Sequence, residues 1–198
     1  MRTLESMKGQ VSAVVIGTSA GGIDALSALL PALSRGCAPV FIVLHLPRER
    51  PSRLVDLFQH KCSARVCEAQ DKDPIERGTI YFAPPDYHLL IDAGPHLALS
   101  TDELVHFSRP SIDVLFESAA EIYGEGLLGI VLTGASEDGA AGLAAVHRAG
   151  GWTVAQDPAT ADVSIMAEAA IKRTPVDFVL SLDQIASVLR TTAIGELQ

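Results

Sequence analysis

Three turns of the sequence carry side chains that could together perform acyl transfer: Ser19, His45 and Asp138. Residues 17–21 read GTSAG, which matches the G-x-S-x-G pattern of a tight strand-to-helix turn with an exposed serine hydroxyl. A serine hydroxyl is a weak nucleophile unless a neighbouring base removes its proton, and an imidazole base needs a carboxylate that holds its tautomer. We therefore interpret the three residues as a candidate triad of nucleophile, general base and orienting acid.

Each of these residues also has a simpler interpretation. A Gly-rich turn after the first strand of a doubly wound sheet often holds a phosphate, and Ser19 could merely cap the helix that follows. However, the turn has neither the G-x-G-x-x-G spacing nor the Gly-Lys-Ser/Thr of a P-loop, which disfavours nucleotide binding. His45 could be a hydrogen-bonded core residue, and Asp138 a turn residue or a helix cap. The triad prediction therefore depends on the conjunction of all three.

The order of the three residues along the chain bears on the fold class, and the positions of the other histidines bear on the choice of the base. The order serine, histidine, acid disfavours the α/β-hydrolase fold, in which the acid precedes the histidine. The other histidines fall on predicted helices, in the hairpin region or in a loop, and we interpret them as surface or structural residues: His60, His88, His96, His106 and His147.

A triad spread this widely along the chain requires a fold that brings strand ends together. Continuous apolar runs predict buried strands, with shorter strands near the carboxyl end of the chain: 11–17, 39–46, 127–133, 152–155 and 178–181. Apolar residues at helical spacing predict the helices between them: 21–33, 50–60, 110–123, 140–148, 164–172 and 183–190. Because the carboxyl ends of parallel strands share one edge of a sheet, the three side chains would meet there.

The middle of the chain differs in character. Between residues 64 and 100, short apolar runs are joined by turns rich in Pro, Gly and Asp, which predicts an antiparallel hairpin insertion. The helix that follows is predicted to begin at Pro110, preceded by Ser108 or Arg109. The predicted fold class is α/β, with a doubly wound, mostly parallel, Rossmann-like sheet and this hairpin inserted.

Composition excludes several classes of function. The 198 residues carry 15 Lys and Arg against 24 Asp and Glu, and this formal net charge of −9 disfavours binding of nucleic acid. No apolar run approaches the ~20 residues of a membrane span, so we expect a cytoplasmic protein without membrane insertion. Cys37, Cys62 and Cys67 form no C-x-x-C pair, which predicts reduced structural thiols. We expect no metal and no cofactor, and one domain over residues 1–198.

Long stretches of the sequence resemble one known family. They cover nearly the whole chain and include VVIGTSAGGIDAL, VLHLP, YFAPPDYHL, SRPSIDVLFESAA and GIVLTGASEDGAAGLAAVHRAGGWTVAQDP. They are similar to the catalytic domain of CheB-type chemotaxis methylesterases, which are protein-glutamate methylesterases and glutamine deamidases. The resemblance implies that Ser19, His45 and Asp138 are nucleophile, general base and orienting carboxylate.

The same resemblance implies a substrate and a regulatory partner. The expected substrate is a methyl-accepting chemotaxis receptor, whose cytoplasmic helices carry glutamate methyl esters and glutamines, and the ester would release methanol. Family members usually carry an N-terminal receiver domain, for which too few residues precede the first predicted strand. We therefore expect a single catalytic domain over these residues: either a domain excised from a longer protein, or an independent esterase that is regulated in some other way. A separate or fused regulatory domain is the candidate regulatory partner.

The sequence also departs from the family pattern. Ala135 stands where a methionine is expected, Glu137 replaces a small or amide residue, and Ala167 follows Met166 where a Met-Pro pair is expected. The backbone of Ala135 and the side chain of Arg109 are the candidate substrate-binding groups. The departures leave two alternatives open: a standalone esterase that acts on a different methylated protein or a small ester, or a binding module without activity.

Overall fold

The computed structural model describes residues 2–46, 53–94 and 96–191. Its larger sheet has seven strands: β1 (Ala13–Thr18), β2 (Val40–Leu44), β3 (Arg65–Glu68), β4 (Thr79–Phe82), β7 (Leu127–Val131), β8 (Trp152–Gln156) and β9 (Phe178–Leu180). All neighbours in this sheet pair in parallel, in the order β3-β4-β2-β1-β7-β8-β9. The chain leaves β1 towards one side of the sheet and later returns on its other side with β7. The carboxyl ends of β1 and β7 therefore form a topological switch point, where open α/β sheets bind ligands.

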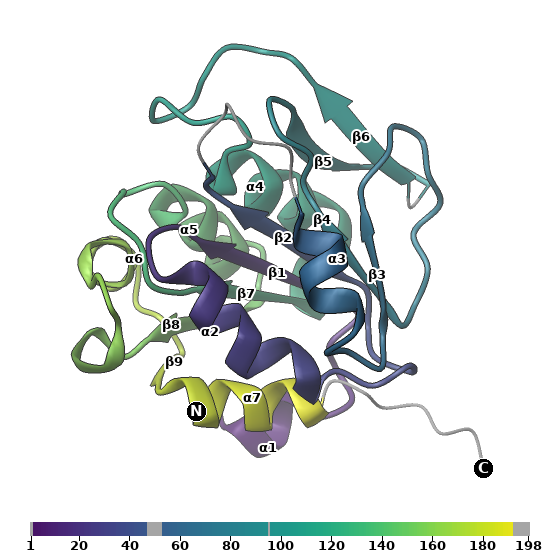
Figure 1. Ribbon diagram of the computed structural model, residues 1–198. Helices are drawn as coiled ribbons and strands as arrows, with labels where there is room; N and C mark the ends of the chain where they lie inside the picture. Colours follow the sequence, from purple (N-terminus) through teal and green to yellow (C-terminus); the bar gives the residue numbers. More distant parts are fainter. Residues whose placement is uncertain (1, 47–52, 95, 192–198) are drawn as a thin grey trace.

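Helices cover both faces of the sheet (Figure 1). They are α1 (Leu4–Met7), α2 (Gly22–Leu29), α3 (Leu54–Gln59), α4 (Ile112–Tyr123), α5 (Ala140–Arg148), α6 (Ile165–Arg173) and α7 (Leu182–Thr191). Successive residues of β1 pack on opposite sides: Val14 and Ile16 join the core under α2 and α7, whereas Ala13 and Val15 join the core under α4 and α5. Burial on both faces explains why β1 is continuously apolar.

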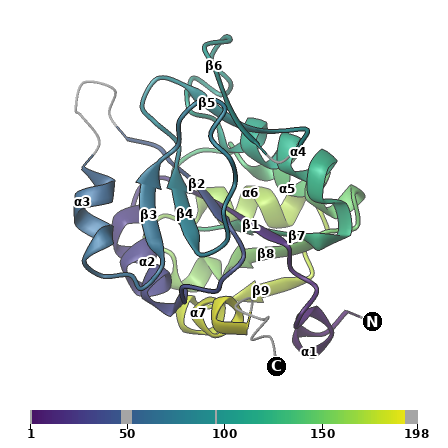
Figure 2. The same cartoon turned by 90° about the vertical axis from the view of Figure 1, so that its right-hand side faces the viewer.

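The predicted hairpin insertion is confirmed only in its second half. Strands β5 (His88–Asp92) and β6 (His96–Ser100) pair in an antiparallel manner as a separate two-stranded sheet, which packs against α4 (Figure 2). The first half of the predicted region, residues 64–83, instead supplies β3 and β4 to the parallel sheet. All four residues of β4 are buried, so this strand has the unalternating pattern of a strand covered on both faces.

Two predicted helix boundaries also need correction. The helix predicted at 110–123 begins at Ile112, and its cap is Ser111 rather than Ser108 or Arg109: the Ser111 side chain accepts from the backbone N–H of Val114 at 3.5 Å. Serine is a favoured cap because its oxygen satisfies one of the unpaired N–H groups of the first turn. Of the helix predicted at 50–60, the structure has α3, and residues 50–52 lie outside the described residues.

The three cysteines are free thiols in the structure. Burial raises the pKa of Cys37 and of Cys67, and it raises the pKa of Cys62 to about 11. Because the thiolate is the reactive form, these side chains are suited to packing rather than to chemistry. Within the described residues, no helix is both long and apolar enough to cross a membrane, and no cluster of His, Cys, Asp or Glu is placed to hold a metal ion.

Candidate active site

The serine turn follows directly from the end of β1. The backbone N–H of Ser19 donates to the carbonyl of Thr133 at 3.0 Å, so the pairing of β1 with β7 continues into the turns that follow the two strands. Gly21 then adopts a left-handed conformation, with φ +79°, at the amino end of α2. A Cβ atom at this position would lie 2.6 Å from Oδ2 of Asp162, so both conformation and space require glycine. The turn thereby leaves the Ser19 side chain half-exposed at the edge of the sheet.

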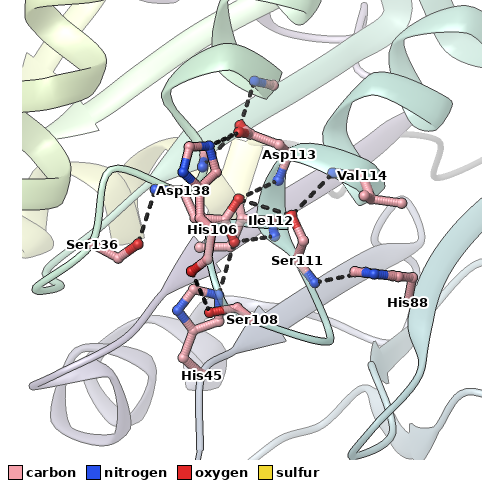
Figure 3. Close-up of polar contacts among 12 residues, drawn as sticks. His45, His88, His106, Ser108, Ser111, Ile112, Asp113, Val114, Ser136 and Asp138 are labelled. Atoms are coloured by element: carbon pink, nitrogen blue, oxygen red, sulfur yellow. Dashed lines mark hydrogen bonds and ion pairs between the residues drawn. The ribbon is translucent and has the colours of Figure 1, made fainter. Parts of the chain in front are cut away.

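His45 lies beside this turn because it follows β2, the neighbour of β1. Its backbone N–H donates to the carbonyl of Thr18 at 3.1 Å, and its ring Nε2 lies 2.9 Å from Oδ2 of Asp138 (Figure 3). Since an ionised carboxylate only accepts, the Nε2 atom carries the proton of this hydrogen bond. A neutral His45 ring therefore keeps Nδ1 as a free base. Among the described residues, the hydroxyl of Ser19 forms no hydrogen bond, so the structure brings His45 and Asp138 into contact but places the serine only nearby. Resting catalytic sites are often loose in this way.

Asp138 is fully buried at the amino end of α4, where four donors hold its carboxylate. Its Oδ1 accepts from the Ser111 hydroxyl and from the backbone N–H of Asp113, each at 2.9 Å. Its Oδ2 accepts from the backbone N–H of Ile112 at 2.7 Å in addition to His45. The first N–H groups of a helix lack intrahelical partners and attract negative charge, so α4 both neutralises and orients the acid (Figure 3).

These contacts determine the charge state of the acid. Burial acts to raise the pKa of Asp138, but the hydrogen bonds from His45 and from the backbone of Asp113 and Ile112 outweigh it and leave the pKa below its ordinary value. The carboxylate is therefore ionised throughout the neutral range. An ionised acid at this position stabilises the imidazolium that would form when His45 takes up a proton.

A second carboxylate makes the reverse connection. Asp113, in the first turn of α4, accepts from the backbone N–H groups of Gly139 at 2.9 Å and Gly142 at 2.6 Å, which belong to the amino end of α5. Its other oxygen lies 3.3 Å from Nε2 of His106. The first N–H groups of each helix thus donate to a carboxylate that lies outside that helix. Asp138, just ahead of α5, accepts from the first turn of α4, and Asp113 of α4 accepts from the amino end of α5. We call this arrangement the reciprocal cap.

We expect Asp113→Asn to gain stability relative to wild type as pH rises. Burial, with the nearby Asp138 charge contributing, raises the pKa of Asp113 in the folded protein above its ordinary value. Between the ordinary pKa of an aspartate and the raised pKa of Asp113 in the folded protein, the folded state binds more protons than the unfolded state. The Asp113 carboxyl therefore lowers the stability of the wild type as pH rises through this range. Asparagine can still accept from Gly139 and Gly142 but carries no charge. Urea unfolding between pH 3 and 7 should therefore show a difference in unfolding free energy, variant minus wild type, that grows with pH.

The control for that series is Asp183→Asn, which removes an exposed carboxylate from the first turn of α7. Its difference from wild type should change little over the same range. A difference for Asp113→Asn that stays constant, or that falls as pH rises, would contradict the assignment of the buried Asp113 charge as a cost.

The two candidate substrate-binding residues lie in different settings. Ala135 is exposed next to Gly134, where an added Cβ would lie 3.0 Å from the Cβ of Ser19, so Ala135 is part of the serine's surroundings. The guanidinium of Arg109 is held by its own loop: it donates to the carbonyls of Thr101 at 2.7 Å and Asp102 at 3.0 Å, and to Oδ1 of Asp86. It fixes the loop ahead of α4, and its contact with substrate stays a prediction.

Sequence reasoning missed the residues that hold the acid. Ser111 was not singled out, and His88 was interpreted only as a surface or structural residue. In the structure His88 is buried, and its Nδ1 accepts from the backbone N–H of Ser111 at 3.1 Å. The available signal was the helix-cap pattern at Ser111, a serine directly before an apolar helical stretch that begins with Ile112.

Comparisons with known proteins agree with the fold. A family model described as CheB methylesterase matches residues 14–189. A solved structure, the CheB methylesterase catalytic domain of Thermotoga maritima, superposes with a TM-score of 0.87 at 32% identity and covers 91% of this chain and 97% of its own. The parallel α/β fold and these two matches therefore define a hydrolase domain.

Two curated relatives narrow this class further. A Leptospira interrogans protein described as a candidate protein-glutamate methylesterase/protein-glutamine glutaminase is 45% identical over 89% of this chain and 92% of the relative. Protein-glutamate methylesterase/protein-glutamine glutaminase 2 of Rhizobium johnstonii is 40% identical over 87% of this chain but only 48% of its own length. This chain belongs to the CheB methylesterase family.

Proposed function

We propose that this protein hydrolyses glutamate γ-methyl esters on the cytoplasmic helices of a methyl-accepting chemotaxis receptor, with Ser19 as nucleophile, His45 as general base and Asp138 as orienting acid. The observation that carries the proposal is the 2.9 Å contact between His45 and Asp138 at the sheet edge, beside the turn that presents Ser19. Residues 1–198 act as a single catalytic domain in the cytoplasm, under a separate or fused regulatory domain.

The reaction proceeds in two acyl-transfer steps. The Oγ of Ser19 attacks the γ-carbonyl carbon of the ester while Nδ1 of His45 takes the hydroxyl proton, because Nε2 is already bonded to Asp138. The His45 imidazolium then protonates the departing methoxide, and methanol leaves a glutamyl ester on Ser19. Water, deprotonated by His45, attacks this ester and releases glutamate and the free serine. A glutamine side chain follows the same path and yields ammonia.

Backbone N–H groups next to the serine are suited to stabilise the tetrahedral intermediate. Within the described residues, the N–H groups of Ala20 and Ala135 donate to no acceptor, and both residues are exposed. They come from the turns after β1 and β7, the two strands at the switch point. Each such donor is typically worth about 100- to 1000-fold in rate. The small Ala135 side chain preserves this backbone role but offers little packing over a substrate.

A receptor helix needs an open surface rather than a deep pocket. The loop ahead of α4 provides a shallow cleft of about 840 Å³, lined by Thr101, Glu103, Leu104, His106, Phe107 and Arg109. Phe107 is 94% exposed there, which suits an apolar contact with a helix surface. With a net charge of −9, general electrostatic attraction to a glutamate-rich receptor would not supply affinity, so local contacts or tethering must.

The test is methanol release from two substrates at matched ester concentration: a methylated receptor fragment and a small glutamate γ-methyl ester. We expect kcat/KM to be higher for the receptor fragment, because the cleft contacts groups that the small ester lacks. Turnover of the small ester without turnover of the fragment would favour the second candidate, hydrolysis of a different methylated protein or a small ester, which the small Ala135 side chain favours. Absence of turnover on both substrates would leave a binding module without activity.

A further inference from the structure

A line of hydrogen bonds connects the β5–β6 hairpin to the His–Asp pair. It begins at His88, which is 1% exposed at the start of β5. The Nδ1 of His88 accepts from the backbone N–H of Ser111 at 3.1 Å, and its Nε2 lies 2.9 Å from the carbonyl oxygen of Glu103. A backbone N–H can only donate and a carbonyl can only accept, so these partners assign a neutral ring with its proton on Nε2. His88 therefore acts as a fixed connector between the hairpin, the loop and the cap of α4.

Ser111 continues the line to the acid. Its hydroxyl has a single proton, which it donates to Oδ1 of Asp138 at 2.9 Å, because a carboxylate cannot donate in return. The same oxygen accepts from the backbone N–H of Val114 and so caps α4. The hydrogen bond that the hydroxyl donates and the one that it accepts are therefore both assigned. Ser111 is fully buried, so solvent does not compete with either of them.

We propose that Ser111 and His88 are positioning residues for the hydrolytic site: His88 fixes the backbone of Ser111, Ser111 fixes the plane of the Asp138 carboxylate, and Asp138 orients His45. Neither residue touches substrate. Their effect on turnover rests on the proposed function, whereas their effect on the His45–Asp138 hydrogen bond does not. Without the Ser111 hydroxyl, Oδ1 of Asp138 keeps one donor among the described residues, the backbone N–H of Asp113, and the carboxylate can tilt.

Ser111→Ala tests the proposal, with Ser118→Ala as matched control. Ser118 also lies on α4, accepts from the backbone N–H of Ile91 in β5 at 3.1 Å and donates to the carbonyl of Leu115, but it touches neither Asp138 nor His45. Both variants thus lose one hydroxyl that ties α4 to its surroundings. We expect Ser111→Ala to lower kcat about 10- to 100-fold with little change in KM, since a misplacement of roughly 1 Å can cost that much. Equal losses in the two variants, at equal folded fraction, would overturn the role of Ser111.

His88 is tested by two polar variants that each keep half of its contacts. In His88→Asn the side-chain oxygen replaces Nδ1 and can accept from Ser111, whereas in His88→Gln the longer amide replaces Nε2 and can donate to Glu103. We expect His88→Asn to retain several times more kcat than His88→Gln, because only the former keeps the contact that positions Ser111. Equal kcat in the two variants, or a higher kcat in His88→Gln, would overturn the role of His88.

A spectroscopic measurement separates this inference from the proposed function. The Nε2 proton of His45, shared with Asp138, should give a downfield proton resonance that disappears in His45→Gln. We expect this resonance to shift or broaden in Ser111→Ala and to stay in place in Ser118→Ala. If the wild type releases no methanol but the resonance responds in this way, the function fails and the positioning role stands. A resonance that is unchanged in Ser111→Ala would overturn the positioning role whatever the activity.

Discussion

Ser19→Ala is expected to reduce methanol release by at least about 10³-fold, because it removes the atom that forms the covalent intermediate. Water activated by His45 would remain as the only nucleophile, and the backbone donors of Ala20 and Ala135 would supply only the residual rate. The measurement is kcat on the small glutamate γ-methyl ester, with rapid trapping of the glutamyl-enzyme in the wild type as a second readout.

The variant should fold normally. Within the described part of the chain the Ser19 hydroxyl makes no hydrogen bond, so its removal leaves no buried partner unsatisfied. Ser27→Ala, on the helix that follows the same turn, is the matched control and should keep wild-type kcat, since the hydrogen bond that its hydroxyl makes in the described part of the chain is to Nζ of Lys61, at 3.4 Å. A Ser19→Ala protein that releases methanol at the wild-type rate would remove the triad mechanism.

Asp138→Asn is expected to lower kcat by about 10⁴-fold, the loss seen when the acid of a Ser-His-Asp triad becomes an amide. The hydrogen bonds around Asp138 indicate that the same substitution also lowers the unfolding free energy. An asparagine must place its NH₂ group in the position of one carboxylate oxygen, where it faces the backbone N–H of Asp113 or that of Ile112. Two donors then oppose each other in a buried site, which should cost about 1–3 kcal/mol of unfolding free energy.

Kinetics and urea unfolding would measure both effects of this substitution. Glu137→Gln is the matched control, because it makes the same carboxylate-to-amide change one residue earlier on an exposed side chain. It should leave the unfolding free energy within about 0.5 kcal/mol of wild type. If Asp138→Asn kept kcat within about tenfold of wild type, His45 would be oriented by other groups and the role of Asp138 would be wrong.

Local patterns predicted the central strands and the β8–β9 side of the sheet well, and the β3–β4 side less well. Strands β1, β2 and β7 lie in largely apolar, continuously buried runs, and the parallel pairing of β1 with β2 brings His45 next to the serine turn. Strand β4 has only four residues, TIYF, flanked by turn residues. Such a run is equally typical of a hairpin and of a short parallel strand, and only its pairing with β2 decides between them.

The residues around the acid were beyond local prediction for a different reason. Asp138 could be found because it lies in the turn that follows β7, but three of its four donors lie at the amino end of α4, which reaches the sheet edge only through packing. Gly17 shows this dependence: a Cβ there would lie 2.3 Å from the Ile112 side chain, so β1 and α4 approach each other closely because the strand carries no side chain at that point. A close approach between a strand and a helix that are far apart in the sequence produces no periodic pattern of residues from which it could be predicted.

The reciprocal cap limits how such a protein can be switched off. A movement of Asp138 away from His45 would also remove the carboxylate that accepts from the first turn of α4. Any motion that separates α4 from α5 would break the hydrogen bonds from Gly139 and Gly142 to Asp113. An inhibitor that works by distorting the acid would therefore have to fray two helices at once. Obstructing the open rim around Ser19 demands no such rearrangement, so steric occlusion is the less costly form of control for this architecture.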